Sequence, residues 1–588
     1  MSAAAARAAR RDRPVPSTSV RPLVPRLGAQ PPWKWVAAVT LLAAILRFVR
    51  LGHSPPGLNQ DEAINAWNAW CLLKTGHDMT GAAWPVFYSH AIGDNRTTLF
   101  FYLLMPFQAL FGLSAWSTRL PAAFFGTLAV PLIGYVAARA WGRGAGVVAA
   151  LLLAVDPWHL FMSRWGIEGS VTPFLALLPV SLLTAAGLWP RGGAPRAAAG
   201  PESSPDFVAG PMPRWPWALA AGLAAGIATY GYWSMRLFLP AWLIVTALLM
   251  GPSVWREWRR GPALRAWLAF LAGLTVTFGP LVWRHIVDPA IAQRAAMTRL
   301  WESGAPPLEI VRLVAERWLI HYGPQFLFMR GDTYELLQPA VDGAMHRFML
   351  PLFLIGLAAV VARFRGDPAS RALVALVGVY PAGDLLAAYD GVHSLRSAAG
   401  IGALVLLATL GAVTAWDWLA ARGRTMARAA AAAFTVVVLV FTVRSLTAFY
   451  GEYNERPDIY RRFYTELAGA ARWLKPKVES ADAVFCTTNF MNQPWAVLLV
   501  ELGYDPHSWF REPRERIRLG QWDEYRRVGR IVFMHDPSAQ RDAQALESNG
   551  KPDRVFFIVR PGQLGLKDPA VVFRNGKDEL LWVCELTL

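Results

Sequence analysis

Long apolar runs, separated by short loops that carry arginine, constrain the fold of this chain more than any other feature. The clearest runs are Trp35–Phe48, Leu120–Ala138, Pro216–Ile227, Leu264–Val282, Arg347–Val361, Ile401–Trp416 and Ala429–Val443. A helix of about 20 residues crosses the core of a bilayer, and these runs reach that length with their flanks. Of the 588 residues, 54% are hydrophobic and only 17% are charged, whereas soluble domains carry about 25% charged residues. The sequence therefore predicts a polytopic membrane protein.

The distribution of arginine indicates how the apolar segments are oriented. The net charge of +17 is explained by the positive-inside rule rather than by a nucleic-acid partner, because most arginines lie in short loops. Of twelve apolar segments, Thr98–Phe111 has only 14 residues and is predicted to lie in the interface. Eleven spans then remain, and a cytosolic N-terminus places the basic loops in the cytosol. These loops carry Arg139/Arg143, Arg191/Arg196/Arg214, Arg256/Arg259/Arg260/Arg265, Arg363/Arg365/Arg371 and Arg422/Arg424/Arg428.

The chain divides into three parts by composition. Residues 1–32 are expected to be a disordered cytosolic tail, residues 33–449 an all-α membrane domain, and residues 450–588 a small α/β domain outside the cytosol. In the last part, we expect a helix followed by short strands: Ile459–Leu474, then Ala483–Cys486, Arg530–Met534, Arg554–Val559, Val571–Phe573 and Leu580–Cys584. Cys486 and Cys584 either form a disulfide there or are two buried thiols.

An acidic pair, Asp61 and Glu62, opens an expected helix over Ala63–Lys74 in the first external loop. The ordinary explanation is structural: Asn59 caps the helix with Glu62 three residues on, and the helix dipole favours carboxylates in a first turn. Taken alone, this stretch favours that explanation over catalysis.

Other polar residues fall at the same membrane boundary under the orientation chosen above. They are Arg96, Arg164, Glu168, Arg236, His393 and Arg396. Each one alone is explained as a membrane-end anchor with a snorkelling side chain. Together they combine carboxylates, which can take a proton from a hydroxyl, with arginines, which can hold a phosphate. The combination suits acid–base chemistry on a phosphate-bearing lipid.

Several motifs resemble one enzyme family. They are Pro-Pro-Gly-Leu-Asn-Gln-Asp61-Glu62-Ala, the Arg96-led helix that ends at Leu110-Phe-Gly112, Arg119-Leu-Pro121, Asp156-Pro-Trp-His-Leu-Phe-Met-Ser-Arg164 and His393-Ser-Leu-Arg396. The first block looks like the start of glycosyltransferase family 39 and its bacterial relatives in the GT-C superfamily. These relatives include protein O-mannosyltransferases and the lipid A aminoarabinose transferase. The resemblance covers roughly residues 35–420.

The resemblance implies a fold, a reaction and roles for single residues. The fold would be GT-C-like, with interfacial helices beside the spans, in a bacterial cytoplasmic membrane with the active face outside. The reaction would be an inverting transfer of a sugar from a polyprenyl-phosphate donor to a glycan, lipid or protein acceptor. Asp61 matches the acid that acts as base or orients the acceptor, Glu62 its partner, and Glu168 the second acidic site. Arg96 matches the basic residue that binds the lipid phosphate in these relatives. Further candidates for contacts with the donor phosphate are Arg164, Arg236, His393 and Arg396.

Neither a metal requirement nor a single function follows from these residues. A divalent cation is permitted but not required by the acids, with Asp61 and Glu168 as its candidate ligands. A transporter of lipids or sugars, or a non-catalytic scaffold of the cell envelope, are the alternative functions. Transporters usually carry ionisable residues near the bilayer midplane, and here they gather at one edge.

Overall fold

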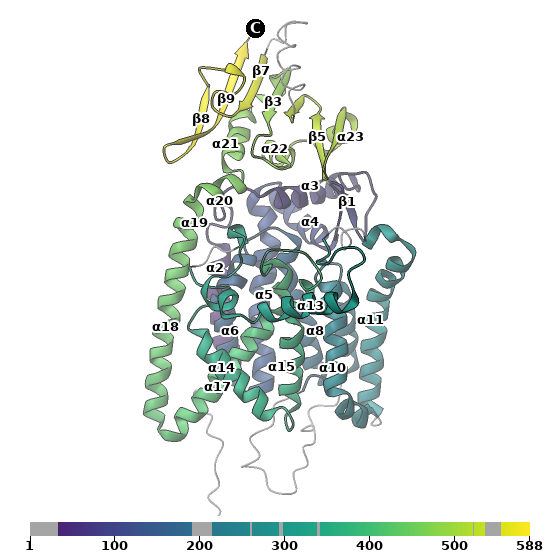
Figure 1. Cartoon of the computed structure of the whole chain (residues 1–588), viewed down its shortest axis with the longest axis vertical. Helices are drawn as coiled ribbons and strands as arrows, with labels where there is room; N and C mark the ends of the chain where they lie inside the picture. The colour runs from purple at the N-terminus through teal and green to yellow at the C-terminus, as the bar shows by residue number, and fades with distance from the viewer. Residues whose placement is uncertain are drawn as a thin grey trace, which may run out of the picture.

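The computed structural model describes residues 33–190, 214–258, 261–292, 298–337, 341–520, 522–535 and 554–587. The predicted tail over residues 1–32 lies outside the described residues, as do Arg191, Arg196, Arg259 and Arg260. Figure 1 shows a bundle of helices with a sheet-containing domain at one end. We call the end of the bundle that meets this domain the sheet end.

Helices make up the bundle, and most of them run along its long axis (Figure 1). In chain order they are α2 (Trp33–Phe48), α3 (Gln60–Thr75), α4 (Leu99–Phe111), α5 (Ala115–Trp141), α6 (Arg143–Val155), α7 (Pro157–Met162), α8 (Thr172–Ala186), α9 (Trp215–Ala228), α10 (Met235–Trp258), α11 (Gly261–Val287), α13 (Pro307–Ile320), α14 (Met349–Arg363), α15 (Pro368–Val379), α16 (Ser394–Ser397), α17 (Ile401–Arg422) and α18 (Arg424–Tyr450). A short hairpin of β1 (Ser89–Ala91) and β2 (Asp94–Arg96) follows α3.

The apolar runs of the sequence form membrane-compatible helices, as predicted. Within the described residues, five helical segments are long and apolar enough to cross a bilayer: Ala115–Trp141, Glu168–Ala186, Gly261–Val287, Ser394–Arg422 and Arg424–Glu455. Shorter apolar helices accompany them, among them α4, α6, α9 and α14. At 13 residues, α4 rises about 20 Å, less than the roughly 30 Å of a bilayer core. Its length agrees with an interfacial position, but α6 is equally short, so the count of eleven spans stays a prediction.

The domain after α18 is built on a mixed sheet. Its strands are β3 (Ala483–Thr487), β4 (Arg514–Leu519), β5 (Trp522–Val528), β6 (Ile531–Met534), β7 (Arg554–Val559), β8 (Val571–Asn575) and β9 (Asp578–Thr587), in the order β4-β5-β6-β3-β7-β9-β8. β3 is parallel to β6 and β7, and the other pairs are antiparallel. Helices α19 (Glu452–Glu455), α20 (Pro457–Arg462), α21 (Thr465–Leu474), α22 (Pro494–Leu502) and α23 (Pro506–Arg511) complete it. The expected α/β character is confirmed.

The predicted helix over Ile459–Leu474 is broken in two. Tyr464 separates α20 from α21 with a left-handed backbone at φ 49°, a conformation that interrupts a right-handed helix and is uncommon for residues other than glycine. Its hydroxyl donates to the backbone oxygen of Asn492 at 2.6 Å and lies 3.1 Å from the side-chain oxygen of Gln60. These contacts join the sheet domain to the start of α3.

The two cysteines of the sheet domain are free thiols and cannot pair. Cys486 in β3 lies opposite Ile558 of β7, whereas Cys584 in β9 lies opposite Phe557. Side chains alternate between the faces of a sheet, so the two sulfurs lie on opposite faces with a strand between them. Of the two explanations open from sequence, the structure supports buried thiols.

The sheet domain and α3 share one hydrophobic core. Trp67 and Cys71 of α3 are buried against Trp495 and Trp509 of the domain, and Trp67 meets Trp509 edge to face at 5.6 Å between ring centroids. Figure 1 shows α3 lying across the sheet end, directly under α22. The helix that carries the acidic pair is therefore clamped between the bundle and the domain.

Candidate active site

The first turn of α3 is organised by a capping box. Asn59 precedes the helix with an extended backbone, and its side chain accepts the N–H of Asp61 at 3.0 Å. Glu62 returns the contact, because its Oε2 accepts the N–H of Asn59 at 3.0 Å. The helix ends at Gly76, whose φ of 74° lies in the left-handed region. This confirms the helix-start explanation offered by the sequence.

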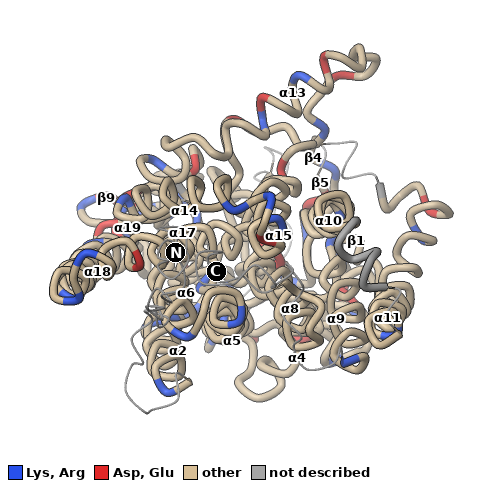
Figure 2. The backbone as a smooth tube through the Cα atoms, turned by 90° about the horizontal axis from the view of Figure 1, so that it is seen from below, with Lys and Arg blue, Asp and Glu red and all other residues tan. Residues whose placement is uncertain are grey.

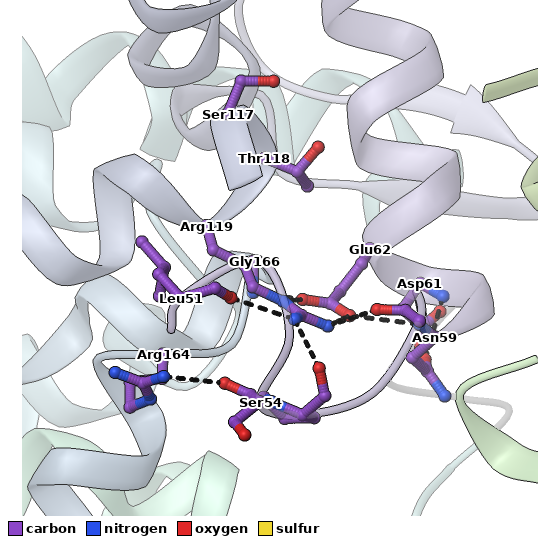
Figure 3. Close-up of polar contacts among 12 residues, drawn as sticks. Leu51, Ser54, Asn59, Asp61, Glu62, Ser117, Thr118, Arg119, Arg164 and Gly166 are labelled. Atoms are coloured by element: carbon purple, nitrogen blue, oxygen red, sulfur yellow. Dashed lines mark hydrogen bonds and ion pairs between the residues drawn. The ribbon is translucent and has the colours of Figure 1, made fainter. Parts of the chain in front are cut away.

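Glu62 is enclosed by protein on all sides. Its oxygens receive Nε and Nη2 of Arg119, each at 2.8 Å, and the N–H of Gly166 at 2.8 Å. Both side chains of the pair are fully buried, as Figure 3 shows for the ring of donors around the carboxylate. Arg119 also donates to the carbonyls of Leu51, Pro55 and Gly57, at 3.2 Å, 2.7 Å and 2.7 Å. Glu62 is therefore the centre of a buried network of hydrogen bonds and has a structural role.

Asp61, one residue earlier, is partly open to solvent. Its Oδ1 lies 2.5 Å from Nη2 of Arg96, and its side chain is 40% exposed. Nη1 of Arg96 lies 3.3 Å from Oε1 of Glu168 and 3.4 Å from the side-chain oxygen of Asn65. Asn65 in turn donates to Glu168 at 3.1 Å. We call these four residues the acid group.

The electrostatics of the acid group keep Arg96 charged. Burial by itself would lower the pKa of its guanidinium, but the carboxylates of Asp61 and Glu168 outweigh that effect and raise it. Two carboxylates face one guanidinium, so the group carries one net negative charge. A single partly exposed carboxylate, held by buried partners, is well placed to accept a proton from a ligand.

The acid group does not fit a metal ion as it stands. The space between Asp61 and Glu168, the candidate ligands, is filled by the guanidinium of Arg96. Across the described part of the chain, no group of three or more His, Cys, Asp or Glu side chains has the arrangement of a metal site.

A second charged cluster forms around Asp384, which is fully buried between α15 and α16. Its carboxylate contacts Arg317 at 3.0 Å, His321 at 3.2 Å and Arg396 at 3.5 Å, and it accepts the backbone N–H of His393 at 3.1 Å. Burial opposes ionisation of Asp384, but the hydrogen bond from His321 and the charge of Arg317 lower its pKa below the usual value. We call this the Asp384 cluster; two guanidinium groups against one carboxylate leave it positive.

The two groups are neighbours. The 3₁₀ turn Glu168–Val171 packs on α16 so tightly that a Cβ on Gly169 would lie 2.4 Å from the side chain of Leu395. Both groups act on Tyr232, in the turn between α9 and α10: burial raises the pKa of its hydroxyl to about 12, with smaller effects from Arg396, Glu168, Asp61 and Asp384. The negative acid group, in which the Asp61 carboxylate is accessible, thus lies close to the positive Asp384 cluster.

The remaining sequence candidates lie elsewhere. Arg164 is buried, and it donates to the carbonyls of Leu46, Arg47 and Ser54 at 3.0 Å, 2.8 Å and 3.0 Å; Figure 3 shows it beside Ser54. Arg236 donates to the carbonyls of Thr229 and Phe87 and stacks over Trp233. Within the described residues, neither guanidinium forms an ion pair with the acid group or the Asp384 cluster.

Several site residues were not predicted from the sequence, although some had left a signal there. Asn65 is four residues after Asp61 and so shares its helix face. Asp384 is an acid at the end of an apolar run, a placement that marks function in membrane proteins. Arg119 stood in a motif of the resemblance without a role. Arg317 and His321 gave no local signal, because only the fold of the long loop before α14 brings them to Asp384.

A helical bundle, a sheet domain at one end and a charged site beneath that domain define the class: a multi-pass membrane protein with an extramembrane domain. The crystal structure of ArnT from Cupriavidus metallidurans in the apo state is similar, with a TM-score of 0.50 and 16% identity, over 94% of this chain and 98% of that one. The same protein bound to undecaprenyl phosphate gives 0.49 and 15% over the same shares. The apo oligosaccharyltransferase of Archaeoglobus fulgidus gives 0.45 and 12%, over 80% of this chain and 63% of that chain.

At 16% identity, the similarity to ArnT establishes the fold. This chain has the same overall fold as that structure, a polytopic helical bundle with a C-terminal domain. No family model matches the sequence, and no curated protein matches it either.

Proposed function

We propose that the chain is a membrane glycosyltransferase. It transfers a sugar from a polyprenyl-phosphate donor to an acceptor hydroxyl on the external face of a bacterial cytoplasmic membrane, with inversion. The observation that carries the proposal is the packing of the turn that starts at Glu168 against α16, which carries Arg396. It brings the partly exposed carboxylate group of Asp61 and Glu168 close to the positive Asp384 cluster. The fold shared with ArnT and the motifs around Asp61 support the same reaction.

In this mechanism, Asp61 accepts the proton of the acceptor hydroxyl. The oxygen then attacks the anomeric carbon, the bond from that carbon to the phosphate oxygen breaks, and the electron pair leaves with the polyprenyl phosphate. One displacement from the opposite side inverts the anomeric centre. Arg396, with His393 beside it, neutralises the departing phosphate, since charge-assisted hydrogen bonds from guanidinium suit phosphate oxygens.

Arg96 and Glu62 act by positioning. Arg96 is engaged by both Asp61 and Glu168, so it fixes the direction of the Asp61 side chain. Glu62 has no open side toward a substrate and holds the first turn of α3 in place. Arg164 and Arg236 stabilise helix ends by donating to the carbonyls of Arg47 in α2 and Thr229 after α9.

The direct test is donor consumption by the purified protein. Reconstituted in nanodiscs, it is given polyprenyl-phosphate hexoses and pentoses with an envelope extract as the source of acceptors. Mass spectrometry follows the release of polyprenyl phosphate, a product that is the same whichever acceptor takes the sugar. We expect release by the wild type, and about a 100-fold or larger loss in Asp61→Asn, because a general base contributes factors of this size.

A matched control is Asp458→Asn. Asp458 pairs with Arg456 at 2.8 Å and is 38% exposed, much like Asp61 with Arg96, but it lies in α20 of the sheet domain. Its rate should equal that of the wild type. Unchanged release by Asp61→Asn rejects Asp61 as the base, and a wild type that moves intact donor across a vesicle membrane without cleaving it is a transporter.

A further inference from the structure

Helix α13 buries a single charged residue on its inner side and exposes apolar residues on its outer side. Leu308, Val311 and Leu319 are 81%, 64% and 61% exposed. With Trp318, which is also exposed, their spacing places them along one side of the helix. Arg317 lies on the opposite side and is buried. We call the four exposed residues the apolar stripe; such a stripe is typical of helices that lie in a membrane surface.

Contacts with α15 fix the level at which α13 lies. The indole N–H of Trp318 donates to the carbonyl of Gly378 at 2.8 Å. The hydroxyl of Tyr322, just after the helix, donates to the carbonyl of Val377 at 2.7 Å. Both carbonyls belong to the last turn of α15. Figure 1 shows α13 crossing the bundle at the height where α15 ends, well below α3.

That height is inside the thickness of a bilayer. α15 has 12 residues and rises about 18 Å, and its first turn lies beside Arg363, Arg365 and Arg371, residues typical of a membrane surface. A bilayer core is about 30 Å thick, so a helix of this length that starts at one surface ends within the core. Figure 2 shows α13 at the outer edge of the bundle, where lipid would surround it.

The buried face of α13 belongs to the Asp384 cluster. Arg317 contacts the Asp384 carboxylate and donates to the backbone carbonyl of the same residue at 2.9 Å. His321, in the turn after the helix, reaches that carboxylate too. The same helix therefore presents an apolar side outward and supplies two of the side chains that hold Asp384 beside Arg396.

We infer that the apolar stripe of α13 is seated among the acyl chains of the leaflet at the sheet end, and that this contact holds the Asp384 cluster together. The occupant is bilayer lipid, because the stripe is continuous with α15 at a depth where only acyl chains are available. The charged flank, where Arg312 and Glu316 pair at 2.7 Å, is turned toward the headgroups. The lipid contact stands by itself; its effect on catalysis rests on the proposed function.

Depth-dependent fluorescence quenching tests the lipid contact without any assay of activity. The three native cysteines are buried, so a cysteine introduced by Val311→Cys or Glu316→Cys takes a nitrobenzoxadiazole label selectively. In nanodiscs with nitroxide on the acyl chains, we expect the label at 311 to be quenched at least about twofold more than the label at 316, as for a helix with one face in the acyl region. Aqueous iodide should reverse the order. Equal quenching at both positions, or iodide access at 311, overturns the inference.

The coupling is tested by Val311→Asp, with Glu316→Ser as the control on the charged flank. An acid in the stripe should displace α13, loosen Arg317 from Asp384 and raise KM for the donor about tenfold, while kcat changes little, because the cluster binds the donor phosphate. A label at Leu319→Cys should lose its quenching in parallel. Lost quenching with an unchanged KM rejects the coupling alone. A wild type that consumes no donor rejects the proposed function, while the quenching result still decides the lipid contact.

Discussion

Glu62 and Arg119 form a two-point ion pair in the interior of the protein. Nε and Nη2 of the guanidinium each lie 2.8 Å from a different carboxylate oxygen, and neither side chain reaches solvent. With the backbone N–H groups of Asn59 and Gly166, the pair ties together the first loop, α5 and the loop before Glu168. Asp61, the catalytic candidate, precedes Glu62 in the same first turn of α3, and its side chain contacts Arg96 instead.

Neutralising Glu62 should destabilise the whole protein. In Glu62→Gln, Arg119 keeps its charge without a buried counter-ion, and we expect a loss of about 3–5 kcal/mol in the free energy of unfolding. Denaturant unfolding in detergent measures it. The control is Glu316→Gln, whose Arg312 partner is exposed and whose effect should stay below about 1 kcal/mol. Equal effects of the two variants would contradict the structural role of Glu62.

Removing the charge of Arg96 should cost activity more than stability. Arg96→Gln leaves Asp61 and Glu168 facing each other without a cation, so Asp61 loses the partner that fixes its direction. We expect about a 100-fold fall in donor consumption, the scale of losing one preorganised electrostatic partner. Arg96→Lys keeps the charge but not the two-armed geometry, and should fall between Gln and the wild type. A Lys variant as poor as Gln would mean that geometry alone matters.

The sheet domain should lose stability as pH rises from about 4.5 to about 7. Glu524 of β5 is 4% exposed, and burial raises the pKa of its carboxyl from 4.5 to about 7. Because the folded state then holds its proton more tightly than the unfolded state does, stability is highest below the unfolded pKa and declines until the folded pKa is passed. The difference corresponds to at most roughly 3 kcal/mol.

Glu524→Gln should remove this pH dependence. The variant keeps an oxygen for the N–H of Gln493, which Glu524 accepts at 3.0 Å, but cannot ionise. Denaturation midpoints at pH 5 and pH 8, followed by the fluorescence of the sheet-domain tryptophans, measure the effect. Glu515→Gln serves as the control, since Glu515 is half exposed. A wild-type midpoint that does not fall between the two pH values would refute the assignment.

All three cysteines should titrate as free thiols. Cys486 and Cys584 lie on opposite faces of the sheet, and Cys71 is buried in the core that α3 shares with the domain. Alkylation of the unfolded protein without reductant, followed by mass spectrometry, should find three modified cysteines. None should react in the folded protein, because all are buried. A pair that resists alkylation until reductant is added would show a disulfide.

Strands with apolar side chains were predictable, and charged ones were not. β3, β6, β7, β8 and β9 overlap the strands expected from sequence, because each alternates or runs apolar. β4 reads Arg-Glu-Arg-Ile-Arg-Leu and is mostly exposed, so no hydrophobic pattern marks it. It is a strand because β5 supplies its hydrogen bonds. Tyr464 likewise breaks a helix that local sequence favours, through contacts with Gln60 and Asn492.

The sequence by itself determined that the chain is a bundle of membrane helices and that Asn59, Asp61 and Glu62 begin a helix. Apolar periodicity and helix capping depend on residues close together in the sequence, so they can be recognised without knowing the fold. Only the tertiary structure decided that the two adjacent acids have different surroundings. Consecutive helix residues point about 100° apart, and their partners come from afar: Arg96 is 35 residues from Asp61, and Arg119 is 57 residues from Glu62. In the folded chain, Asp61 pairs with Arg96 and stays partly exposed, whereas Glu62 pairs with Arg119 in the interior. This difference makes Asp61 the candidate base and Glu62 a structural acid.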